Sequence, residues 1–360
     1  MPDITHHTRS DEVWILGASG RIGSDVTTRL LARGLRPVPV GRDSDRLRKT
    51  AADLGLRTVI ADGTDAIAVE ITRQRPAVVF NAIGNYADTA TTLARACMPG
   101  GHYLDLAPDL TAVPRLLDLH EEATAHGSTM VTASGFGCLA TEAVVVKLCE
   151  NRPTPATVRI DALSSVATEE GVMGAGFAAS IVDSMTTGGR RYENGRMVTA
   201  RLGADPQHLT LPDGQKVKSA GAPTAELLAA HRASNAPSIT FTTALAPTSP
   251  VVRAVLPLAA RLMAIPALRR FAVRRLAGVK LKASPRPRRH SWGHAVIIWP
   301  DGTRREGWLR ADDGMDYTAA VATEVATRLA KGEGRPGAFT PAAALGPDIA
   351  IAAGGTFLLD

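Results

Sequence analysis

The chain has 360 residues and a mass of 37.8 kDa, which predicts two domains because single hydrophobic cores rarely grow past about 300 residues. With 45% hydrophobic and 21% charged residues, the composition excludes a wholly disordered protein, and the three cysteines have no spacing that indicates a disulfide framework or a Cys-rich metal site. The net charge of +6 is concentrated in one segment, which argues against a nucleic-acid-binding protein that is basic all over.

The N-terminus is polar and has no apolar stretch that would indicate a signal peptide. The longest stretch without a charge, residues 233–252, is rich in Ser, Thr, Asn and Pro, and it does not read as a membrane span. These features predict a cytoplasmic protein.

The first apolar run, at residues 12–16, leads into a glycine-rich turn and then into a helical pattern at 24–33. This is the strand–turn–helix setting of dinucleotide-binding sites. Gly17 permits the tight turn, Gly20 lets the backbone approach a pyrophosphate, and Gly23 lets the helix pack close to the sheet. The helix N-terminus offers N–H groups and the positive end of its dipole. The predicted cofactor-binding residues of this turn are Gly17, Ser19, Gly20, Arg21, Ile22 and Gly23.

A second strand, at residues 36–40, ends in Gly41-Arg-Asp-Ser44. An NAD enzyme usually has an acidic residue at this end, on the ribose 2′-hydroxyl. Arg42 instead suits the 2′-phosphate of NADP, and Ser44 and Arg46 can assist it. Asp43 keeps NAD open as the alternative, because it could be the usual acidic residue displaced by one or two positions. The sequence favours NADP(H).

Strands and helices continue to alternate beyond the second strand. Strands are predicted at 57–61, 77–82, 102–106 and 129–133, and helices at 89–98 and 109–126. This alternation predicts an α/β fold with a Rossmann-type doubly wound parallel sheet. Ligands of such sheets lie at the carboxyl ends of the strands. The remaining predicted cofactor-binding residues lie there: Asp62, Asn81, Ala82, Ile83 and Gly84.

Hydride transfer needs positioned reactants and a proton donor for the atom that becomes negative. Tyr86 is the first candidate, because it follows the strand that ends near Asn81, although its hydroxyl could instead cap the loop. Tyr103 and Asp105 alternate with a leucine and therefore share a face of their strand. Asp105 could orient the donor or bind a cationic imine, or serve only as a loop or helix cap. The predicted catalytic residues are Tyr86, Tyr103 and Asp105, with His102 and Glu142 also within expected reach.

The remaining chain predicts a second, α+β domain. Its expected elements are a strand at 157–165, a helix at 177–187, hairpin turns at Glu193-Asn-Gly and Pro212-Asp-Gly, a longer hairpin at 292–309 and a helix at 317–330. We predict a Rossmann domain at 11–138 that is completed by 331–360, and a substrate domain inserted at 139–330.

Residues 227–300 contain no Asp or Glu but twelve Arg and Lys residues, most of them in a basic segment at 253–289. Without these twelve, the chain would have 29 basic and 35 acidic residues, so the high pI is a local property. A helix is expected at 267–279, and Pro257 and Pro266 are expected to interrupt any longer helix. The segment could lie on a membrane surface, dock an acidic carrier protein or an anionic substrate, or be a solvated basic face.

Several of these motifs together resemble the saccharopine dehydrogenase-like oxidoreductases. The resemblance implies an NADP-binding Rossmann domain, an inserted substrate domain that contains a sheet, and a C-terminal return to the first domain. The family includes reductases of C=N bonds and trans-acting enoyl reductases, which act on C=C bonds in lipid and polyketide chains. The segments that carry the likeness are 17–23, 40–43, 80–86, 96–105 and the tail Pro336-Gly-Ala-Phe-Thr-Pro341.

The chain departs from the family pattern at three places. Many members have proline where Asn85 stands, and Gly-Phe-Asp is common where this chain has Gly135-Phe-Gly137. A glycine–threonine pair of the enoyl-reductase-like branch is replaced by Gly176-Phe177. These positions lie where the substrate is expected, so the departures concern the substrate and not the fold.

The sequence lacks the motifs that other classes of enzyme require. No tyrosine is followed four residues later by lysine, which excludes the short-chain dehydrogenase mechanism, and the chain has no HExxH, GxSxG or GK[ST] motif. We therefore predict an NADPH-dependent reductase of a C=N bond in a small metabolite, without a metal site. The alternatives are an enoyl reductase that acts on a lipid or polyketide thioester, free or carrier-bound, and a non-catalytic NADP sensor. A homodimer also stays open.

Overall fold

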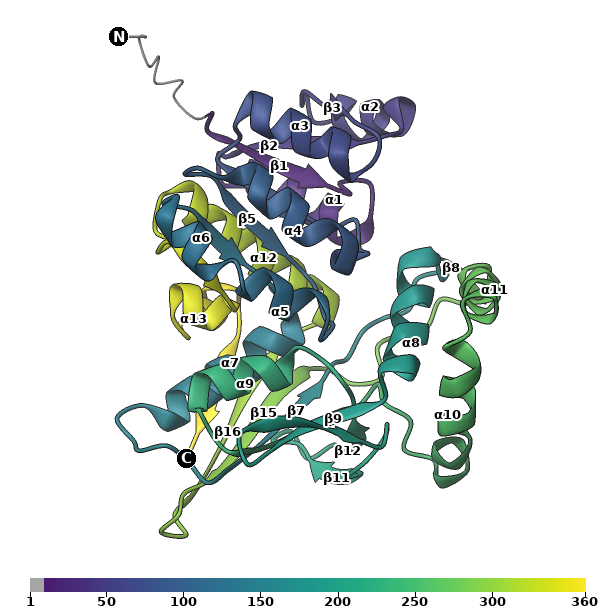
Figure 1. Cartoon of the computed structure of the whole chain (residues 1–360), viewed down its shortest axis with the longest axis vertical. Coiled ribbons are helices and arrows are strands. Elements are labelled where there is room, and N and C mark those ends of the chain that lie inside the picture. Colours follow the sequence, from purple (N-terminus) through teal and green to yellow (C-terminus); the bar gives the residue numbers. More distant parts are fainter. Residues whose placement is uncertain (1–9) are drawn as a thin grey trace. The chain divides into compact units, whose positions relative to one another are not determined.

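The computed structural model describes residues 10–360, which divide into two compact units (Figure 1). Unit 1 comprises residues 10–107, 111–134 and 322–345. Unit 2 comprises residues 108–110, 135–321 and 346–360. The segment predicted to complete the first domain, 331–360, is therefore shared: it belongs to unit 1 as far as Leu345 and to unit 2 from Gly346 onwards.

Unit 1 is built on a parallel seven-stranded sheet with the order β17-β6-β5-β4-β1-β2-β3. The strands are β1 (Glu12–Leu16), β2 (Arg36–Gly41), β3 (Val59–Ile60), β4 (Val78–Asn81), β5 (His102–Asp105), β6 (Thr129–Val131) and β17 (Gly337–Phe339). The order of the chain reverses where β1 lies between β2 and β4. Ligands of open α/β sheets bind at such a switch point, outside the carboxyl ends of the strands. The predicted doubly wound sheet is confirmed.

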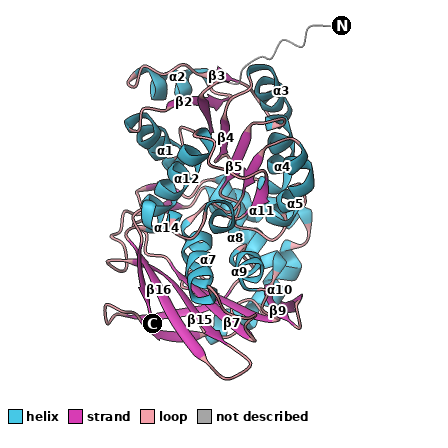
Figure 2. Cartoon of the chain, turned by 90° about the vertical axis from the view of Figure 1, so that its left-hand side faces the viewer, coloured by secondary structure: helices cyan, strands magenta, loops and turns pink. Residues whose placement is uncertain are grey.

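Helices cover the unit 1 sheet on both faces. Figure 2 shows α1 on one side of β4 and β5, and α3 and α4 on the other side. The five residues of β1 are all buried, as a strand covered on both faces requires. The helices are α1 (Arg21–Ala32), α2 (Ser44–Ala52), α3 (Thr64–Gln74), α4 (Tyr86–Cys97), α5 (Ala112–Leu117), α6 (His120–Ala125), α13 (Pro341–Leu345) and the C-terminal part of α12 (Gly314–Ala330).

The predicted element bounds need three corrections in unit 1. The helix expected at 109–126 is two short helices, α5 and α6, because the chain turns between Asp118 and Leu119. The strand expected at 57–61 is only the two residues of β3. Helix α4 begins three residues earlier than expected, and Tyr86 is its first residue.

Unit 2 contains a nine-stranded mixed sheet with the main order β10-β9-β13-β7-β15-β16-β18, from which β12 and β11 extend beside β13. Its strands are β7 (Thr157–Leu163), β9 (Gly189–Glu193), β10 (Arg196–Ala200), β11 (Gln207–Thr210), β12 (Lys216–Gly221), β13 (Ser238–Thr243), β15 (Ser291–Ile298), β16 (Arg304–Ala311) and β18 (Thr356–Leu359). The three predicted hairpins are confirmed as β9–β10, β11–β12 and β15–β16.

Helices α7 (Phe136–Cys149) and α9 (Glu226–Ser234) pack together on one face of this sheet (Figure 2). Glycines allow α7 to approach closely: a Cβ on Gly293 of β15 would lie 2.6 Å from the Cβ of Ala140. The short helix α14 (Ile349–Ala352) precedes β18, which pairs with β16.

A further layer of unit 2 comprises α8 (Ala175–Thr187), α10 (Pro250–Met263) and α11 (Pro266–Ala277), with the strand pair β8 (Gly171–Val172) and β14 (Lys280–Leu281). The prediction that Pro257 interrupts a helix is wrong, because α10 runs through this position. Pro266 does begin a new helix, in the first turn where proline is tolerated. In the described part of the chain, no single helix has the length and apolar character to cross a membrane. Helices α10 and α11 reach that length and apolar character only when they are taken together, and they are bent by 116° relative to one another.

Candidate functional site

Two of the three glycines in the turn between β1 and α1 are required by the local backbone conformation and packing. Gly17 has a φ of +85°, which disfavours any residue with a side chain. A Cβ on Gly23 would lie 2.3 Å from the carbonyl oxygen of Gly17 and 2.8 Å from its carbonyl carbon. Because both neighbours are backbone atoms, they cannot move aside as a side chain would. Helix α1 can therefore pack this closely on the turn only with glycine at position 23.

Gly20 is different, because a side chain there would meet the protein at only one close contact. Its φ is −83°, and a Cβ would meet only the carbonyl oxygen of Gly17, at 3.3 Å. Gly20 is exposed and is the N-cap of α1, where no side chain caps the helix. The first turn of α1 thus begins at an exposed residue without a side chain, and no side chain caps it. This arrangement fits a pyrophosphate at the helix N-terminus.

The end of β2 separates the roles of Arg42 and Asp43. β2 lies beside β1 with Val40 opposite Leu16, so Arg42 follows directly along the edge that carries the glycine turn. Asp43 accepts hydrogen bonds within its own loop: Oδ1 from the N–H of Asp45 at 3.1 Å, and the carbonyl oxygen from the N–H of Leu47 at 3.0 Å. Asp43 therefore caps α2, whereas Arg42 is exposed.

A buried polar network joins the carboxyl ends of β4, β5 and β6. Nδ2 of Asn81 donates to the hydroxyl of Tyr103 at 3.0 Å, and that hydroxyl donates to Oδ2 of Asp105 at 3.0 Å. Oδ1 of Asp105 accepts from the hydroxyl of Thr132 at 2.8 Å and from the backbone N–H of Ala107 and Ala133. The shared face predicted for Tyr103 and Asp105 is confirmed, and both side chains are fully buried.

This network fixes the loop that leads into α4. Oδ1 of Asn81 accepts from the N–H of Ile83, and Nδ2 of Asn81 donates to the hydroxyl of Thr89. The loop passes through two residues with positive φ, Gly84 and Asn85. Proline cannot adopt the φ of +50° found at Asn85, so the loop differs here from that of the family members with proline. Tyr86 begins α4 half-buried, against the apolar core of unit 1.

The other predicted cofactor-binding residues lie at the same edge of the sheet. Ala82 packs under Gly17, whose Cβ would lie 3.0 Å from the Ala82 carbonyl oxygen. Ile83 is 42% exposed, and Asp62 is exposed in the loop after β3. Ser19 and Ile22 are half-buried in the turn and in the start of α1, where Arg21 is exposed.

Unit 2 contains a carboxyl group that the sequence did not indicate as functional. Oε1 of Glu226, the first residue of α9, lies 2.2 Å from the position that a Cβ of Gly137 would occupy. Burial raises the pKa of Glu226. It also raises the pKa of the neighbouring Cys138, which Glu142 and Glu226 raise further. The one sequence feature that could have drawn attention to this place is Gly137, because the family that the chain resembles commonly has aspartate at this position.

Comparison with known proteins identifies the nucleotide-binding part of the chain. Residues 13–131 match the family described as the saccharopine dehydrogenase NADP binding domain. Over these residues the chain is similar to that NADP-binding domain. The predicted resemblance is thereby confirmed, and so is NADP as the cofactor of this domain.

Two curated relatives are trans-acting enoyl reductases, one from Mycobacterium tuberculosis and one from Mycobacterium bovis. Each is 27% identical to this chain over 218 residues, which cover 57% of this chain and 51% of the relative. This chain thus spans about half the length of the curated relatives it matches. Among solved structures, apo saccharopine dehydrogenase (L-Glu forming) from Saccharomyces cerevisiae matches 98% of this chain and 100% of its own, with a TM-score of 0.61. At 12% identity, this likeness shows the fold alone.

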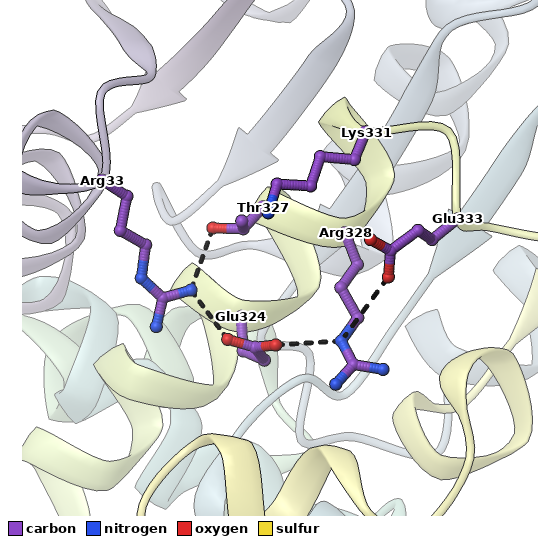
Figure 3. A pocket seen from close by; sticks show the side chains of 6 residues that line it. All are labelled: Arg33, Glu324, Thr327, Arg328, Lys331 and Glu333. Carbon is purple, nitrogen blue, oxygen red and sulfur yellow. Dashed lines mark hydrogen bonds and ion pairs between the residues drawn. The ribbon is translucent and has the colours of Figure 1, made fainter.

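A hollow in unit 1 lies away from the glycine turn. It is lined by Arg33 at the C-terminal end of α1 and by residues of α12 and the following loop (Figure 3). Nη1 of Arg33 lies 2.7 Å from Oε2 of Glu324, and Nε of Arg328 lies 2.9 Å from Oε1. Burial raises the pKa of Glu324, but the hydrogen bonds from Arg328 and Arg33 outweigh this and hold it below its usual value. Because nucleotides bind such folds at the opposite end of α1, we infer that the charged side chains lining this hollow hold α1 and α12 together.

Within the described residues, no group of three His, Cys, Asp or Glu side chains could hold a metal ion.

Arg42→Ala is expected to weaken NADPH binding about tenfold to a hundredfold, because it removes charge-assisted hydrogen bonds to the 2′-phosphate. NADH lacks this phosphate, so its affinity should change little. Fluorescence titration of both nucleotides measures the difference, with the exposed Arg48→Ala as a control. Equal weakening of NADPH and NADH by Arg42→Ala would contradict the assignment.

Asp105 is expected to make stability depend on pH, because burial raises its pKa from 3.8 to about 6. The folded protein then holds this proton more tightly than the unfolded chain does. The free energy of unfolding should therefore fall as the pH rises from about 4 to about 6, by on the order of 3 kcal/mol. Asp105→Asn should flatten this slope, whereas the exposed Asp53→Asn should keep it. Urea unfolding across this pH range measures the slope, and an unchanged slope in Asp105→Asn would refute the prediction.

Proposed function

We propose that this chain is an NADPH-dependent oxidoreductase that transfers hydride to the carbon of a C=N bond in a small metabolite. The observation that carries the proposal is the exposed Gly20 at the start of α1, which no side chain caps, within an NADP-binding domain. NADPH, when bound, supplies the hydride. The N–H groups at the start of α1 would hold its pyrophosphate, and Arg42 would hold its 2′-phosphate.

Reduction of a C=N bond requires a proton as well as a hydride. Hydride adds to the carbon, the π electrons pass to the nitrogen, and the nitrogen takes up a proton to become an amine. We propose Tyr86 as a donor of this proton, since it begins α4 at the loop that Asn81 fixes. Tyr103 and Asp105 are buried without exposed surface, which supports a positioning role for both: they hold the three loops at the carboxyl edge of the sheet.

Glu226 is a second proposed acid, and its surroundings favour a nitrogen-containing substrate. A carboxyl group with a raised pKa keeps its proton nearer neutral pH, which suits general acid catalysis. Glu142, only 1% exposed, places another carboxyl group near Cys138 on α7. A protonated Glu226 can donate a hydrogen bond, and then its proton, to an imine nitrogen.

The second candidate function is the reduction of a C=C bond in an acyl thioester. The names of the curated relatives support it, as does the basic segment 253–289, which would attract an acidic carrier protein. In this reaction, hydride adds to one carbon of the C=C bond and a proton adds to the other.

Consumption of NADPH with two substrate panels tests the proposal. One panel holds 2-oxo acids and aldehydes with amines, and the other holds enoyl thioesters, both free and carrier-bound. Turnover with the first panel alone supports C=N reduction, and turnover with the second panel alone replaces it by enoyl reduction. Tight NADPH binding without turnover on either panel would overturn the enzyme proposal in favour of an NADP sensor. The cytoplasmic location and the homodimer stay predictions.

A further inference from the structure

The surface of α10 carries an unusual row of exposed aliphatic side chains. Val251, Val255, Leu258 and Leu262 are spaced four, three and four residues apart, so they lie in one stripe along the helix. Their exposed fractions are 75%, 55%, 62% and 45%. Figure 1 shows α10 beside α8, and the two helices are in contact, so the helix is attached to unit 2 while the side chains of this stripe stay exposed. Contiguous apolar surface of this kind indicates a binding surface.

Helix α11 continues the surface after a sharp bend. It contacts both α8 and α10, and none of its residues is buried. Ile265 at the bend is 49% exposed and Phe271 is 63% exposed. We call residues 250–277 the α10–α11 elbow. The elbow thus presents large apolar side chains from both of its helices and from the bend between them.

The elbow also carries a strong positive charge. Its exposed arginines are Arg261, Arg270, Arg274 and Arg275, and the exposed Lys280 and Lys282 follow directly. The segment from 227 to 300 contains no acidic residue, so its own sequence supplies no carboxylate to neutralise them. Exposed positions of the elbow therefore carry both apolar and cationic groups.

From this combination we propose that the α10–α11 elbow docks on an anionic lipid membrane. The aliphatic stripe would enter the boundary between headgroups and acyl chains, while the arginines would lie on the lipid phosphates. A second copy of the chain would bring two basic elbows together, which like-charge repulsion disfavours. An anionic bilayer offers both an apolar interior and a layer of negative charge to one docking surface.

Sedimentation with vesicles tests this docking on the full chain. Wild-type protein should co-sediment with vesicles of mixed phosphatidylcholine and phosphatidylglycerol, much less with phosphatidylcholine alone, and less as salt is added. Arg270→Glu with Arg274→Glu should lower the partition coefficient at least about tenfold, since each basic residue contributes substantially at an anionic surface. Leu258→Asn with Leu262→Asn should lower it similarly and should reduce the binding that persists in high salt.

Two matched controls separate docking from general surface effects. Arg196→Glu alters an exposed arginine of β10, and Val69→Asn alters an aliphatic residue of α3 that is 64% exposed. Both should sediment like wild type. NADPH affinity measured on every variant should stay unchanged, which shows that the protein is folded and makes this test independent of the proposed reaction.

Three results would overturn the proposal. They are wild-type protein that stays in the supernatant with anionic vesicles, equal sedimentation with neutral and anionic vesicles, and elbow variants that sediment like wild type. Binding to an acidic acyl carrier protein in place of vesicles, lost in Arg270→Glu with Arg274→Glu, would assign the elbow to a protein partner instead.

Discussion

Gly23→Ala is expected to weaken NADPH binding at least about a hundredfold and to lower the melting temperature. The new Cβ would lie 2.3 Å from the carbonyl oxygen of Gly17, so α1 must move away from the turn. Overpacking of this kind costs about 1–3 kcal/mol of stability. The displacement also moves the N–H groups that hold the pyrophosphate, and misplacement by about 1 Å is enough for an effect of a hundredfold.

Gly20→Ala distinguishes an effect on NADPH binding from an effect on packing. The new Cβ would meet only the carbonyl oxygen of Gly17, at 3.3 Å, so the melting temperature should fall far less than in Gly23→Ala. NADPH binding should still fall, because the side chain would meet the pyrophosphate. Gly278→Ala, at an exposed position with room for a side chain, is the matched control and should change neither property. Titration calorimetry and thermal unfolding measure the two properties. Unchanged NADPH affinity in Gly20→Ala would show that the turn does not hold the cofactor.

Glu226→Gln is expected to lower kcat about a hundredfold on the substrate that reacts in the panel, since general acid catalysis contributes about that much or more. Glutamine keeps the shape of the side chain but cannot give up a proton. The pH profile of kcat should lose the limb that reports this acid. Glu121→Gln, which changes an exposed glutamate of α6, should leave both kcat and its pH profile unchanged.

Gly137→Ala tests the same group without changing any charge. The new Cβ would occupy the place of Oε1 of Glu226, and the flexible side chain can swing aside, so the protein should fold. We expect kcat to fall as in Glu226→Gln because the carboxyl group is displaced. If Tyr86→Phe lowers kcat while Glu226→Gln and Gly137→Ala do not, the proton comes from Tyr86 and the proposal for Glu226 is wrong.

Local sequence was enough to predict the nucleotide turn. The glycines of the β1–α1 turn interact with one another within a few residues, and the cap that Asp43 provides for α2 is also local. The alternation that put Tyr103 and Asp105 on one face was equally reliable. Their burial was not predictable, because it depends on Thr132 and Ala133 of the next strand, which the sequence cannot place against them.

Long-range packing accounts for what the sequence did not reveal. Glu226 reaches Gly137 from a different helix, and no spacing rule connects the two residues. The prediction that Pro257 interrupts a helix was wrong for a related reason. A proline inside a helix loses one backbone hydrogen bond, but the packing of α10 against α8 keeps the helix continuous through that position.

The strand β17 sets an order of events during synthesis. It pairs with β6 at the edge of the unit 1 sheet, although the ribosome makes it only after nearly all of unit 2. Until then, β6 is an open edge of a parallel sheet, and parallel sheets with distant pairings close slowly. The nascent chain must therefore keep this edge from pairing elsewhere while unit 2 emerges. Stop codons placed before Gly337 should consequently release aggregation-prone chains rather than a free nucleotide-binding domain.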